Sequence, residues 1–316
     1  MNFIAFNPIY QERVWGGTGI GSKLGRILPP GKSIGESWEV VDRSEAQSRI
    51  AAGRWEGMTF QEVLRAHGEE IMGPRYKVGE PFPILVKWLD CAQRLSLQVH
   101  PPEKMARLLG GQAKTEMWYI HEAEESAALY VGLKSGVSRV KFEEALRCER
   151  LETVIHRIAV NGGDSMFVPS GRVHAVDAGN LILEIQQNSD TTYRVHDWGR
   201  IGLDGKPRTL YLEESLKCIN FSDYEPLPLR SSEGFQILAE SLEFRVTKYD
   251  ACEAEEQFNF QSFEQPRLLH IVRGGLKDLE SGATLQIGDS ILLPYSSSFT
   301  FQTLKDTRIL ITDQFC

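Results

Sequence analysis

Short apolar or alternating runs, each bounded by turn-forming residues, recur along the whole chain and limit its fold more than any other sequence feature. They are rich in Val, Ile, Leu and aromatic residues, and Gly, Pro, Asn or Asp closes most of them. Such runs are typical of strands that pair with one another. We therefore predict a mainly antiparallel β structure. Its clearest strands are SRIAAG (48–53), PILVKWL (83–89), RLSLQVH (94–100), SAALYVGL (126–133), SMFVPS (165–170) and LILEIQQ (181–187).

Helical patterns are fewer and lie between groups of strands. Thr59 begins a run with helical spacing, and Glu62 comes three residues after Thr59. This is the capping-box pattern, and it predicts a helix over 59–70. Other stretches with helical spacing cover 102–109, 138–157 and 212–219. The predicted fold is a β-barrel or sandwich with a few inserted α-helices.

A faint internal repeat suggests two related barrels in tandem, although one match of this kind can also arise by chance. Residues 163–176 read GDSMFVPSGRVHAV and residues 288–301 read GDSILLPYSSSFTF, so a Gly-Asp turn, a strand and a Pro recur. At this offset Phe299 stands where the first copy has His174. We expect a functional domain over 1–224 and a degenerate barrel without metal over 225–316, with 225–234 as the linker.

Bulk composition excludes several classes of function. The net charge is −8, and no block of Lys and Arg is present, which argues against binding to nucleic acid. No apolar stretch is long enough to span a membrane, and the N-terminal residues do not resemble a signal peptide. The five cysteines are scattered without a CxxC pair, so we expect neither a disulfide framework nor a zinc ribbon. The default location is the cytoplasm.

The run RLSLQVHPP carries the first chemical signal. Alternation places Ser96, Gln98 and His100 on one face of a strand. The opposite face holds Leu95, Leu97 and Val99. A Gln and a His inside a barrel are costly unless a partner satisfies them, and a metal ion would satisfy both.

Further polar residues complete a possible metal site. Glu116 begins an apolar strand and shares a face with Lys114, and His174 follows the turn SGRV. With Gln98 and His100 these residues form a plausible ligand set for Zn²⁺, Mn²⁺ or Fe²⁺. Spacing alone leaves the alternative open that they are polar turn residues with no shared partner.

The segment LEIQQNSDTTYRVHDW (183–198) is also unusually polar. Glu184 and Gln186 alternate with apolar residues, and several hydrogen-bonding residues precede Arg194. An arginine there suits an anion or a polar substrate. The alternative is a loop capped by its own Asn and Asp side chains.

At these motifs the chain resembles the type I mannose-6-phosphate isomerases, especially their short bacterial form. The matching stretches are RVWGG (13–17), GESWEV (35–40), PFPILVKWLD (81–90), LSLQVHPP (95–102), KTEMWYI (114–120), GDSMFVPSGRVHAV (163–176) and LEIQQNSDTTYRVHDW (183–198). The resemblance covers the first two thirds of the chain. It implies tandem cupin (jelly-roll) domains, a zinc ion, and interconversion of mannose 6-phosphate and fructose 6-phosphate through an enediolate.

Site residues carried over from the family fall on the same motifs. The implied metal ligands are Gln98, His100, Glu116 and His174. The implied catalytic residues are Arg194, Glu184 and Lys114. Ser96 and Lys87 correspond to positions near the sugar phosphate.

The chain departs from the family in two places, and other functions stay open. The longer members carry a helical domain for which this chain has no room, and VHDWGR adds His196 and Asp197 after the arginine. The alternatives are a metal oxygenase, another cupin sugar-phosphate isomerase, and a non-catalytic sugar-binding cupin. The expected partner is a sugar phosphate, and the chain is expected to act as a monomer or a homodimer.

Overall fold

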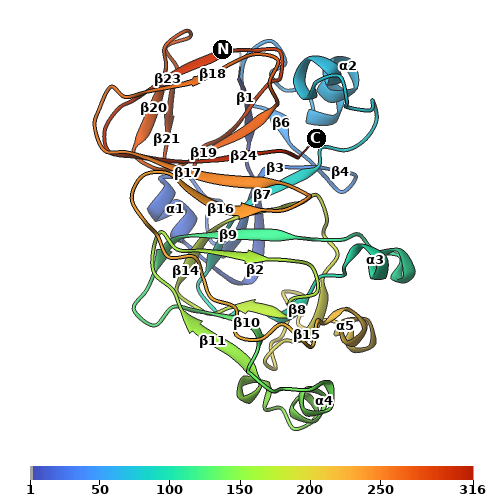
Figure 1. Cartoon of the computed structure of the whole chain (residues 1–316). Coiled ribbons are helices and arrows are strands. Elements are labelled where there is room, and N and C mark those ends of the chain that lie inside the picture. The colour runs from blue at the N-terminus through green and yellow to red at the C-terminus, as the bar shows by residue number, and fades with distance from the viewer. Residues whose placement is uncertain (1–2, 316) are drawn as a thin grey trace. The chain divides into compact units, whose positions relative to one another are not determined.

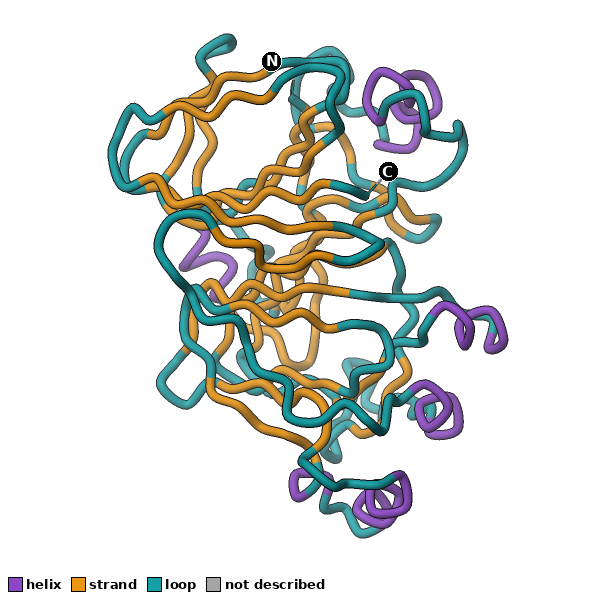
Figure 2. The backbone as a smooth tube through the Cα atoms, in the orientation of Figure 1, coloured by secondary structure: helices purple, strands orange, loops and turns teal. Residues whose placement is uncertain are grey.

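Strands make up most of the regular structure in the computed structural model, which describes residues 3–315 (Figures 1 and 2). This confirms the predicted mainly β fold with few helices. Contacts divide the chain into two units, each built from stretches that are distant in sequence. The first unit comprises Met1–Ile9, Trp38–Val86 and Ser231–Cys316, and the second comprises Tyr10–Ser37 and Lys87–Arg230.

Two antiparallel sheets form the second unit. The first sheet has the order β11-β10-β13-β8-β15 and consists of β8 (Leu97–Val99), β10 (Ala128–Leu133), β11 (Ile155–Ala159), β13 (His174–Val176) and β15 (Tyr193–His196). The other has the order β12-β9-β14-β7-β3-β2 and consists of β2 (Ile9–Gly17), β3 (Ile34–Val40), β7 (Ile84–Cys91), β9 (Glu116–Ala123), β12 (Ser165–Val168) and β14 (Asn180–Gln187). Strands β3 and β7 each continue into the first unit.

An apolar cluster fills part of the space between these two sheets. Leu129 and Val176 of the five-stranded sheet pack in it with Trp118 and Ile182 of the six-stranded sheet. Burial of these side chains is the main force that holds the sheets face to face. The remaining interior is free for polar residues.

Helices cover the outer face of the five-stranded sheet. Leu97 and Val99 of β8 pack in one cluster with Phe142 of α4 and Cys218 of α5. The helices of this unit are α1 (Gly19–Leu24), α3 (Glu103–Leu109), α4 (Arg139–Arg147), the 3-10 turn η1 (Leu151–Thr153) and α5 (Leu212–Cys218). The expected helices at 102–109 and 212–219 are thus confirmed.

The helical prediction for 138–157 holds only in its first half. After α4 the chain makes the turn η1 and enters β11, which pairs antiparallel with β10. Ile155, at the start of β11, is fully buried. Pairing with a neighbouring strand therefore outweighs the local helical spacing in this stretch.

The first unit is also built of sheets. Its seven-stranded sheet has the order β16-β17-β24-β19-β22-β1-β6 and consists of β1 (Ile4–Asn7), β6 (Arg49–Ile50), β16 (Gln236–Glu240), β17 (Arg245–Ala251), β19 (Arg267–Arg273), β22 (Ser290–Leu293) and β24 (Thr307–Asp313). Smaller sheets hold β18 (Gln257–Phe260), β20 (Gly275–Asp278), β21 (Thr284–Gln286) and β23 (Phe299–Thr303), and separately β4 (Asp42–Arg43) with β5 (Ala46–Gln47). Its one helix within the described residues is α2 (Phe60–Met72). Thr59 and Glu62 form the predicted capping box of α2.

The observed division of the chain differs from the expected boundary at 224/225. Strand β1 pairs with β22 on one side and with β6 on the other, so the N-terminal strand completes the sheet of the C-terminal residues. Residues 3–9 and 38–86, which belong to the first of the two domains predicted from the sequence, therefore lie with the C-terminal stretch. Residues 1, 2 and 316 of the expected domains lie outside the described residues.

The sequence repeat has a structural counterpart in the turns that open β12 and β22. Gly163 and Gly288 have the same backbone φ of 93°. Asp164 and Asp289 each accept a hydrogen bond from the backbone N–H three residues earlier, at 2.9 and 2.8 Å. A positive φ at Gly and an Asp that caps its own turn explain why Gly-Asp recurs at both places.

Phe299 stands in the repeat where the other copy has His174, and it is packed in a core. Its ring stacks on Phe301, with centroids 5.9 Å apart, in the apolar cluster of the first unit. The absence of a metal from this unit stays a prediction.

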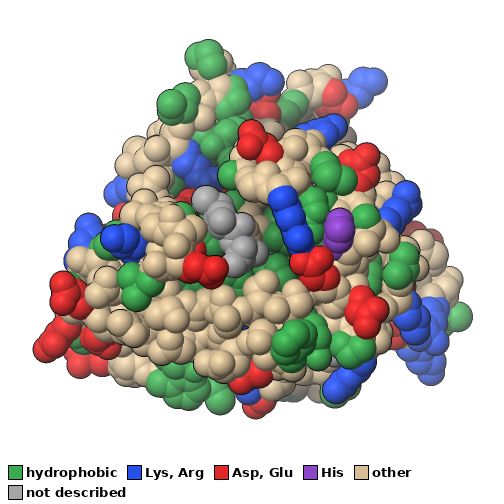
Figure 3. Space-filling view, turned by 90° about the horizontal axis from the view of Figure 1, so that it is seen from above, with side chains coloured by type: hydrophobic (Ala, Val, Ile, Leu, Met, Phe, Trp, Pro, Cys, Tyr) green, Lys and Arg blue, Asp and Glu red, His purple; other side chains and the backbone are tan. Residues whose placement is uncertain are grey.

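Charged and apolar side chains share the surface. On the face drawn in Figure 3, acidic and basic side chains are interspersed with hydrophobic ones. The described residues on that face therefore do not form the continuous basic surface that nucleic-acid phosphates require. Within residues 3–315, no helix is both long and apolar enough to cross a membrane.

A buried histidine in the first unit makes stability depend on pH. His270 is fully buried between Ser290 and Thr312, and burial lowers its pKa to about 3. Its pKa in the unfolded chain is about 6.5, so between these values the unfolded chain binds more protons. The free energy of unfolding should fall as the pH drops below about 6.5, by at most about 1.4 kcal/mol per pH unit from this residue.

We expect His270→Gln to weaken this pH dependence. Urea unfolding between pH 6 and pH 4 should give a smaller loss of stability per pH unit for the variant than for the parent. His67→Gln, at a partly exposed position of α2, controls for the loss of a histidine outside the core. Equal slopes in the parent and His270→Gln would contradict the account.

Candidate metal centre and active site

Strand pairing places three of the predicted site residues on one face of the five-stranded sheet. Gln98 in β8 lies opposite His174 of β13 on one side and opposite Arg194 of β15 on the other. Directly opposed residues of antiparallel strands project to the same face. Leu97 and Val99 pack on the outer face, so these three polar side chains face the interior.

Glutamates of the six-stranded sheet project into the same interior. Glu116 of β9 lies opposite Gln186 of β14, and Trp118 lies opposite Glu184. The alternation of β9 and β14 therefore sets both glutamates on the face that carries Trp118. Trp118 belongs to the apolar cluster between the sheets, so its position identifies this face as the inner one.

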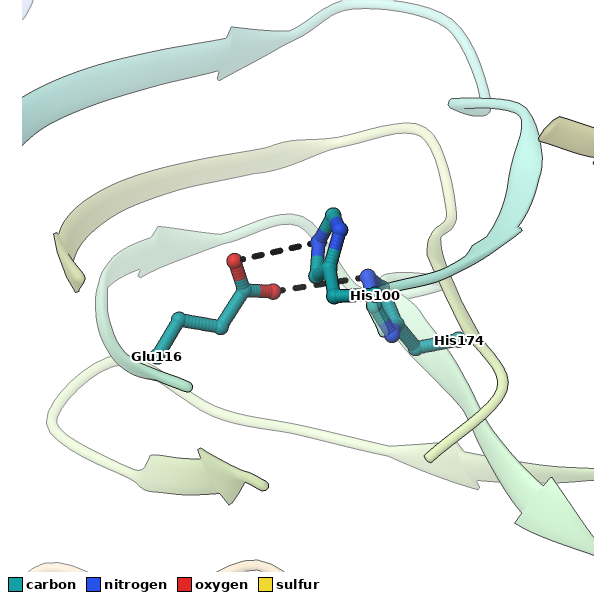
Figure 4. A group of neighbouring side chains, drawn as sticks. All are labelled: His100, Glu116 and His174. Carbon is teal, nitrogen blue, oxygen red and sulfur yellow. Dashed lines mark ion pairs between the residues drawn. The ribbon is translucent and has the colours of Figure 1, made fainter. Parts of the chain in front are cut away.

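His100, Glu116 and His174 form a compact buried group (Figure 4). Nε2 of His100 is 3.4 Å from Oε2 of Glu116, and Nε2 of His174 is 3.4 Å from Oε1. The three ligand atoms lie within 4.8 Å of one another, and all three residues are buried. Within the described residues, no other group of His, Cys, Asp and Glu meets this spacing.

Backbone carbonyls orient both imidazoles. Nδ1 of His100 is 2.9 Å from the carbonyl oxygen of Thr191, and Nδ1 of His174 is 2.8 Å from that of Arg172. A carbonyl only accepts, so Nδ1 carries the proton in each ring and Nε2 keeps a lone pair. Among residues 3–315 neither Nε2 has a hydrogen-bond partner, and both face the Glu116 carboxylate. A cation between them would convert a repulsive arrangement into a stable one.

The protonation states also suit a cation. Burial lowers the pKa of His100, and it lowers the pKa of His174 to about 3, so both rings are neutral at neutral pH. Burial is the largest single influence on Glu116 and would raise its pKa, but Lys114, His100 and His174 together outweigh burial and hold the pKa well below its usual range. Two neutral imidazoles and a carboxylate are the donors that zinc-type ions bind in proteins.

A lysine connects this group to a second carboxylate. Nζ of Lys114 is 2.8 Å from Oε2 of Glu116 and 4.0 Å from Oε2 of Glu184. Nζ of Lys87 approaches the same Glu184 oxygen at 3.8 Å. Trp118 donates its indole N–H to the other Glu184 oxygen at 3.0 Å. Charges therefore alternate in sign from Glu116 through Lys114 and Glu184 to Lys87.

The pKa values of Lys114 and Glu184 are both raised, but for different reasons. Burial opposes the charge of Lys114, yet Glu116 and Glu184 outweigh it and raise its pKa. Burial raises the pKa of Glu184, and the Glu116 charge adds to this effect. A carboxyl whose pKa is raised toward neutrality in a pocket is suited to proton transfer.

A cavity of about 570 Å³ opens beside the buried group. This size accommodates a phosphorylated monosaccharide. Six predicted site residues line it: Lys87, Ser96, Gln98, Lys114, Glu184 and Arg194.

Arg194 presents a partly satisfied cation to this cavity. Its Nη1 donates to the carbonyl of Thr209 at 2.8 Å, whereas its buried Nε has no partner within residues 3–315. Burial lowers its pKa from the usual arginine value, although the group stays charged at neutral pH. An anion would supply the missing acceptor.

The cavity also holds residues that we did not single out from the sequence. Arg13 lines it and makes a bidentate ion pair with Glu36, at 2.9 and 3.1 Å. Both belong to the motifs RVWGG and GESWEV, but neither residue type signals a role there. Tyr211 reaches the cavity from a loop with no recognisable pattern. Arg208 of the same loop was expected from the sequence as a further cation for the substrate phosphate, and it also lines the cavity.

One detail of the predicted alternation is wrong. We had placed Leu95 with Leu97 and Val99 on the outer face, but Leu95 packs in the cluster between the sheets. Strand β8 begins only at Leu97, so strict alternation does not extend to the residues before it.

Known proteins similar to this chain point to one family. A sequence profile described as "Phosphomannose isomerase type I, catalytic domain" matches residues 3–131. The probable mannose-6-phosphate isomerase GmuF of Bacillus subtilis is 39% identical over 67% of this chain and 66% of its own length. The putative mannose-6-phosphate isomerase YvyI of the same organism is 31% identical over 98% of this chain and 97% of its own.

The fold has a close counterpart among solved structures. The crystal structure of the mannose 6-phosphate isomerase from Bacillus subtilis superposes with a TM-score of 0.87 at 28% identity. The match covers 99% of this chain and 100% of that one. This confirms the predicted cupin-type fold.

If the buried group binds metal, loss of one imidazole should abolish tight binding. We expect His174→Ala to retain little divalent metal after zinc loading and desalting, because only two strong donors of the three remain. The parent should retain about one ion per chain. Elemental analysis of the purified proteins measures this directly.

His270→Ala is the matched control, because it removes another fully buried imidazole outside this group. It should retain as much metal as the parent. Equal retention by His174→Ala and the parent would show that the ion binds elsewhere.

Proposed function

Because this chain belongs to the type I phosphomannose isomerase family, we propose that it interconverts mannose 6-phosphate and fructose 6-phosphate in the cavity of the second unit. The observation that carries this proposal is the buried group of His100, Glu116 and His174 next to Lys114 and Glu184. An aldose–ketose isomerase needs a cation for developing negative charge and an acid–base group for a proton, and both chemistries are adjacent here.

The resident ion is proposed to be zinc, with Mn²⁺ or Fe²⁺ as alternatives. Gln98, His100, Glu116 and His174 would hold it, and type I phosphomannose isomerases are metal-dependent. When bound, a divalent cation stabilises the negative charge that develops on the sugar oxygens during isomerisation. Gln98 supports this role because it lies opposite His174 on the inner face of β8.

Of Glu184 and Lys114, Glu184 is the better candidate for moving the proton between C2 and C1 of the sugar. Its raised pKa and its place in the cavity wall suit a group that accepts a proton and returns it. The Trp118 indole N–H fixes one carboxyl oxygen and leaves the other toward Lys114 and Lys87. Lys114 is held in its charged form by two carboxylates, so it suits donation to a sugar oxygen of the enediolate.

The anionic end of the substrate requires cations. Arg194 lines the cavity, its Nε has no partner within residues 3–315, and it is proposed to stabilise negative charge on the substrate. Lys87 and Ser96 line the same cavity and are proposed to contact the sugar phosphate. A guanidinium and an ammonium together suit a phosphate dianion better than either does alone.

We further propose that the enzyme acts in the cytoplasm as a monomer or a homodimer. The cysteines Cys91, Cys148, Cys218 and Cys252 are free thiols, which is typical of a reducing compartment.

Replacing Glu184 should separate proton transfer from metal binding. We expect Glu184→Gln to slow exchange of the C2 proton of mannose 6-phosphate with solvent by about a hundredfold or more, because the amide cannot accept the proton. Deuterium incorporation followed by NMR measures the exchange, and elemental analysis should show unchanged metal. Glu39→Gln is the control, because Glu39 is similarly buried and does not line the cavity. Unchanged exchange in Glu184→Gln removes this residue from the mechanism.

Metal removal should abolish turnover reversibly. We expect EDTA treatment followed by desalting to inactivate the enzyme, since the charge that develops on the sugar oxygens then loses the divalent cation proposed to stabilise it. Stoichiometric Zn²⁺ should restore activity in an assay that compares mannose 6-phosphate with glucose 6-phosphate. Full activity of a metal-stripped sample would contradict the proposal, and a preference for glucose 6-phosphate would assign another isomerase activity.

A further inference from the structure

The segment over residues 198–211, here named the cavity loop, forms part of the cavity wall. It connects β15 to α5 and contributes Gly202, Leu203, Asp204, Arg208 and Tyr211 to the lining. Trp198 packs, partly buried, against the cluster on the outer face of the five-stranded sheet. The other apolar side chains of the loop are exposed, including Leu203 at 63%. A loop without a core of its own depends on its polar anchors for a defined conformation.

One of these anchors is an ion pair that joins Asp197, just before the loop, to Arg208 near its end. Arg208 donates from Nε to Oδ2 of Asp197 at 2.7 Å and from Nη2 to Oδ1. The Asp197 side chain is 6% exposed and that of Arg208 is 22% exposed. Asp197 itself does not line the cavity. Bidentate, half-buried pairs of this kind fix geometry far better than exposed ones.

The same part of the loop holds Arg194. The residue after Arg208 is Thr209, whose carbonyl accepts the hydrogen bond from Nη1 of Arg194 at 2.8 Å. Tyr211 closes the contact by donating its backbone N–H to the Arg194 carbonyl at 2.8 Å. The position of Arg208 thus sets the position of the acceptor that orients the Arg194 guanidinium.

We propose that Asp197 is a positioning residue: by holding Arg208 it places the Thr209 carbonyl that orients Arg194 in the cavity. The proposal deepens the proposed function and rests on it, because Arg194 acts on the substrate only if the cavity binds one. Asp197 lies three residues after Arg194 in the sequence RVHDWGR.

Electrostatics support this arrangement. Arg194 and Arg208 are like charges that line one cavity. Burial and the charge of Arg208 both lower the pKa of Arg194, whereas Asp197 acts in the opposite direction. Asp197 therefore compensates the second guanidinium, whereas Nε of Arg194 has no partner among residues 3–315.

The test is a double-mutant cycle on the metal-loaded enzyme. Asp197→Asn should lower kcat for mannose 6-phosphate by about tenfold or more, because the Arg194 guanidinium loses its fixed orientation. In the Arg194→Lys background the same substitution should cost about twofold or less, since the contact that it supports is already gone. A general structural role would give the same loss in both backgrounds.

The matched control is Asp313→Asn. Asp313 and Arg245 form another bidentate pair, with side chains 7% and 27% exposed, and neither lines the cavity. Loss of this pair should leave kcat within about twofold of the parent. Metal content should be unchanged in both variants.

A crystal structure of metal-loaded Asp197→Asn gives a readout that does not depend on turnover. Nη1 of Arg194 should no longer lie within hydrogen-bond distance of the Thr209 carbonyl. If Asp197→Asn does not fold, Asp197→Glu keeps the charge while its longer side chain displaces Arg208, and the same criteria apply.

Equal losses in the two backgrounds, or an unmoved Arg194 in the crystal structure, would overturn the positioning role. An inactive parent would instead overturn the proposed function, and the crystal structure would still decide whether Asp197 positions Arg194.

Discussion

The charge of Glu116 is the constraint on which the interior of the second unit depends. Its carboxylate has no exposure and lies 2.8 Å from Lys114 and 3.4 Å from the Nε2 atoms of His100 and His174. Leaving a buried charge without a partner costs about 3–5 kcal/mol, so Lys114 is essential to the arrangement. The imidazoles add lone pairs rather than protons on this side, because carbonyls take both Nδ1 protons. A cation bound here would therefore compensate the Glu116 charge and the imidazole lone pairs that face it.

This arrangement separates two tasks between two carboxylates. Glu116 stays ionised beside the imidazoles, whereas burial raises the pKa of Glu184. Lys114 lies between them and couples their charges. Environment, not residue type, thus suits one glutamate to the proposed role of metal ligand and the other to the proposed proton transfer. The cavity beside them adds Arg194 and Lys87 for an anionic substrate.

Sequence patterns predicted the mainly β fold and many of the residues that face the interior of the second unit. Gln98 and His100 follow from period-2 alternation, because alternation sets the face of a strand without knowledge of its partners. It failed at Leu95, which precedes the strand, and helical spacing failed at 155–157, where pairing with β10 takes over. The place of β1 beside β22 could not be foreseen, since no local pattern encodes a pairing between chain ends. The ion pair between Asp197 and Arg208 could not be predicted either, because both residues lie in irregular backbone, where no periodic pattern indicates which side chains meet.

The most direct test of the account is zinc-edge anomalous diffraction from crystals of the metal-loaded protein. The account predicts a single strong peak per chain among Nε2 of His100, Nε2 of His174 and the carboxylate of Glu116, with the amide oxygen of Gln98 as the further ligand. A peak at other residues, or no peak in this group from protein that carries zinc in solution, would contradict it.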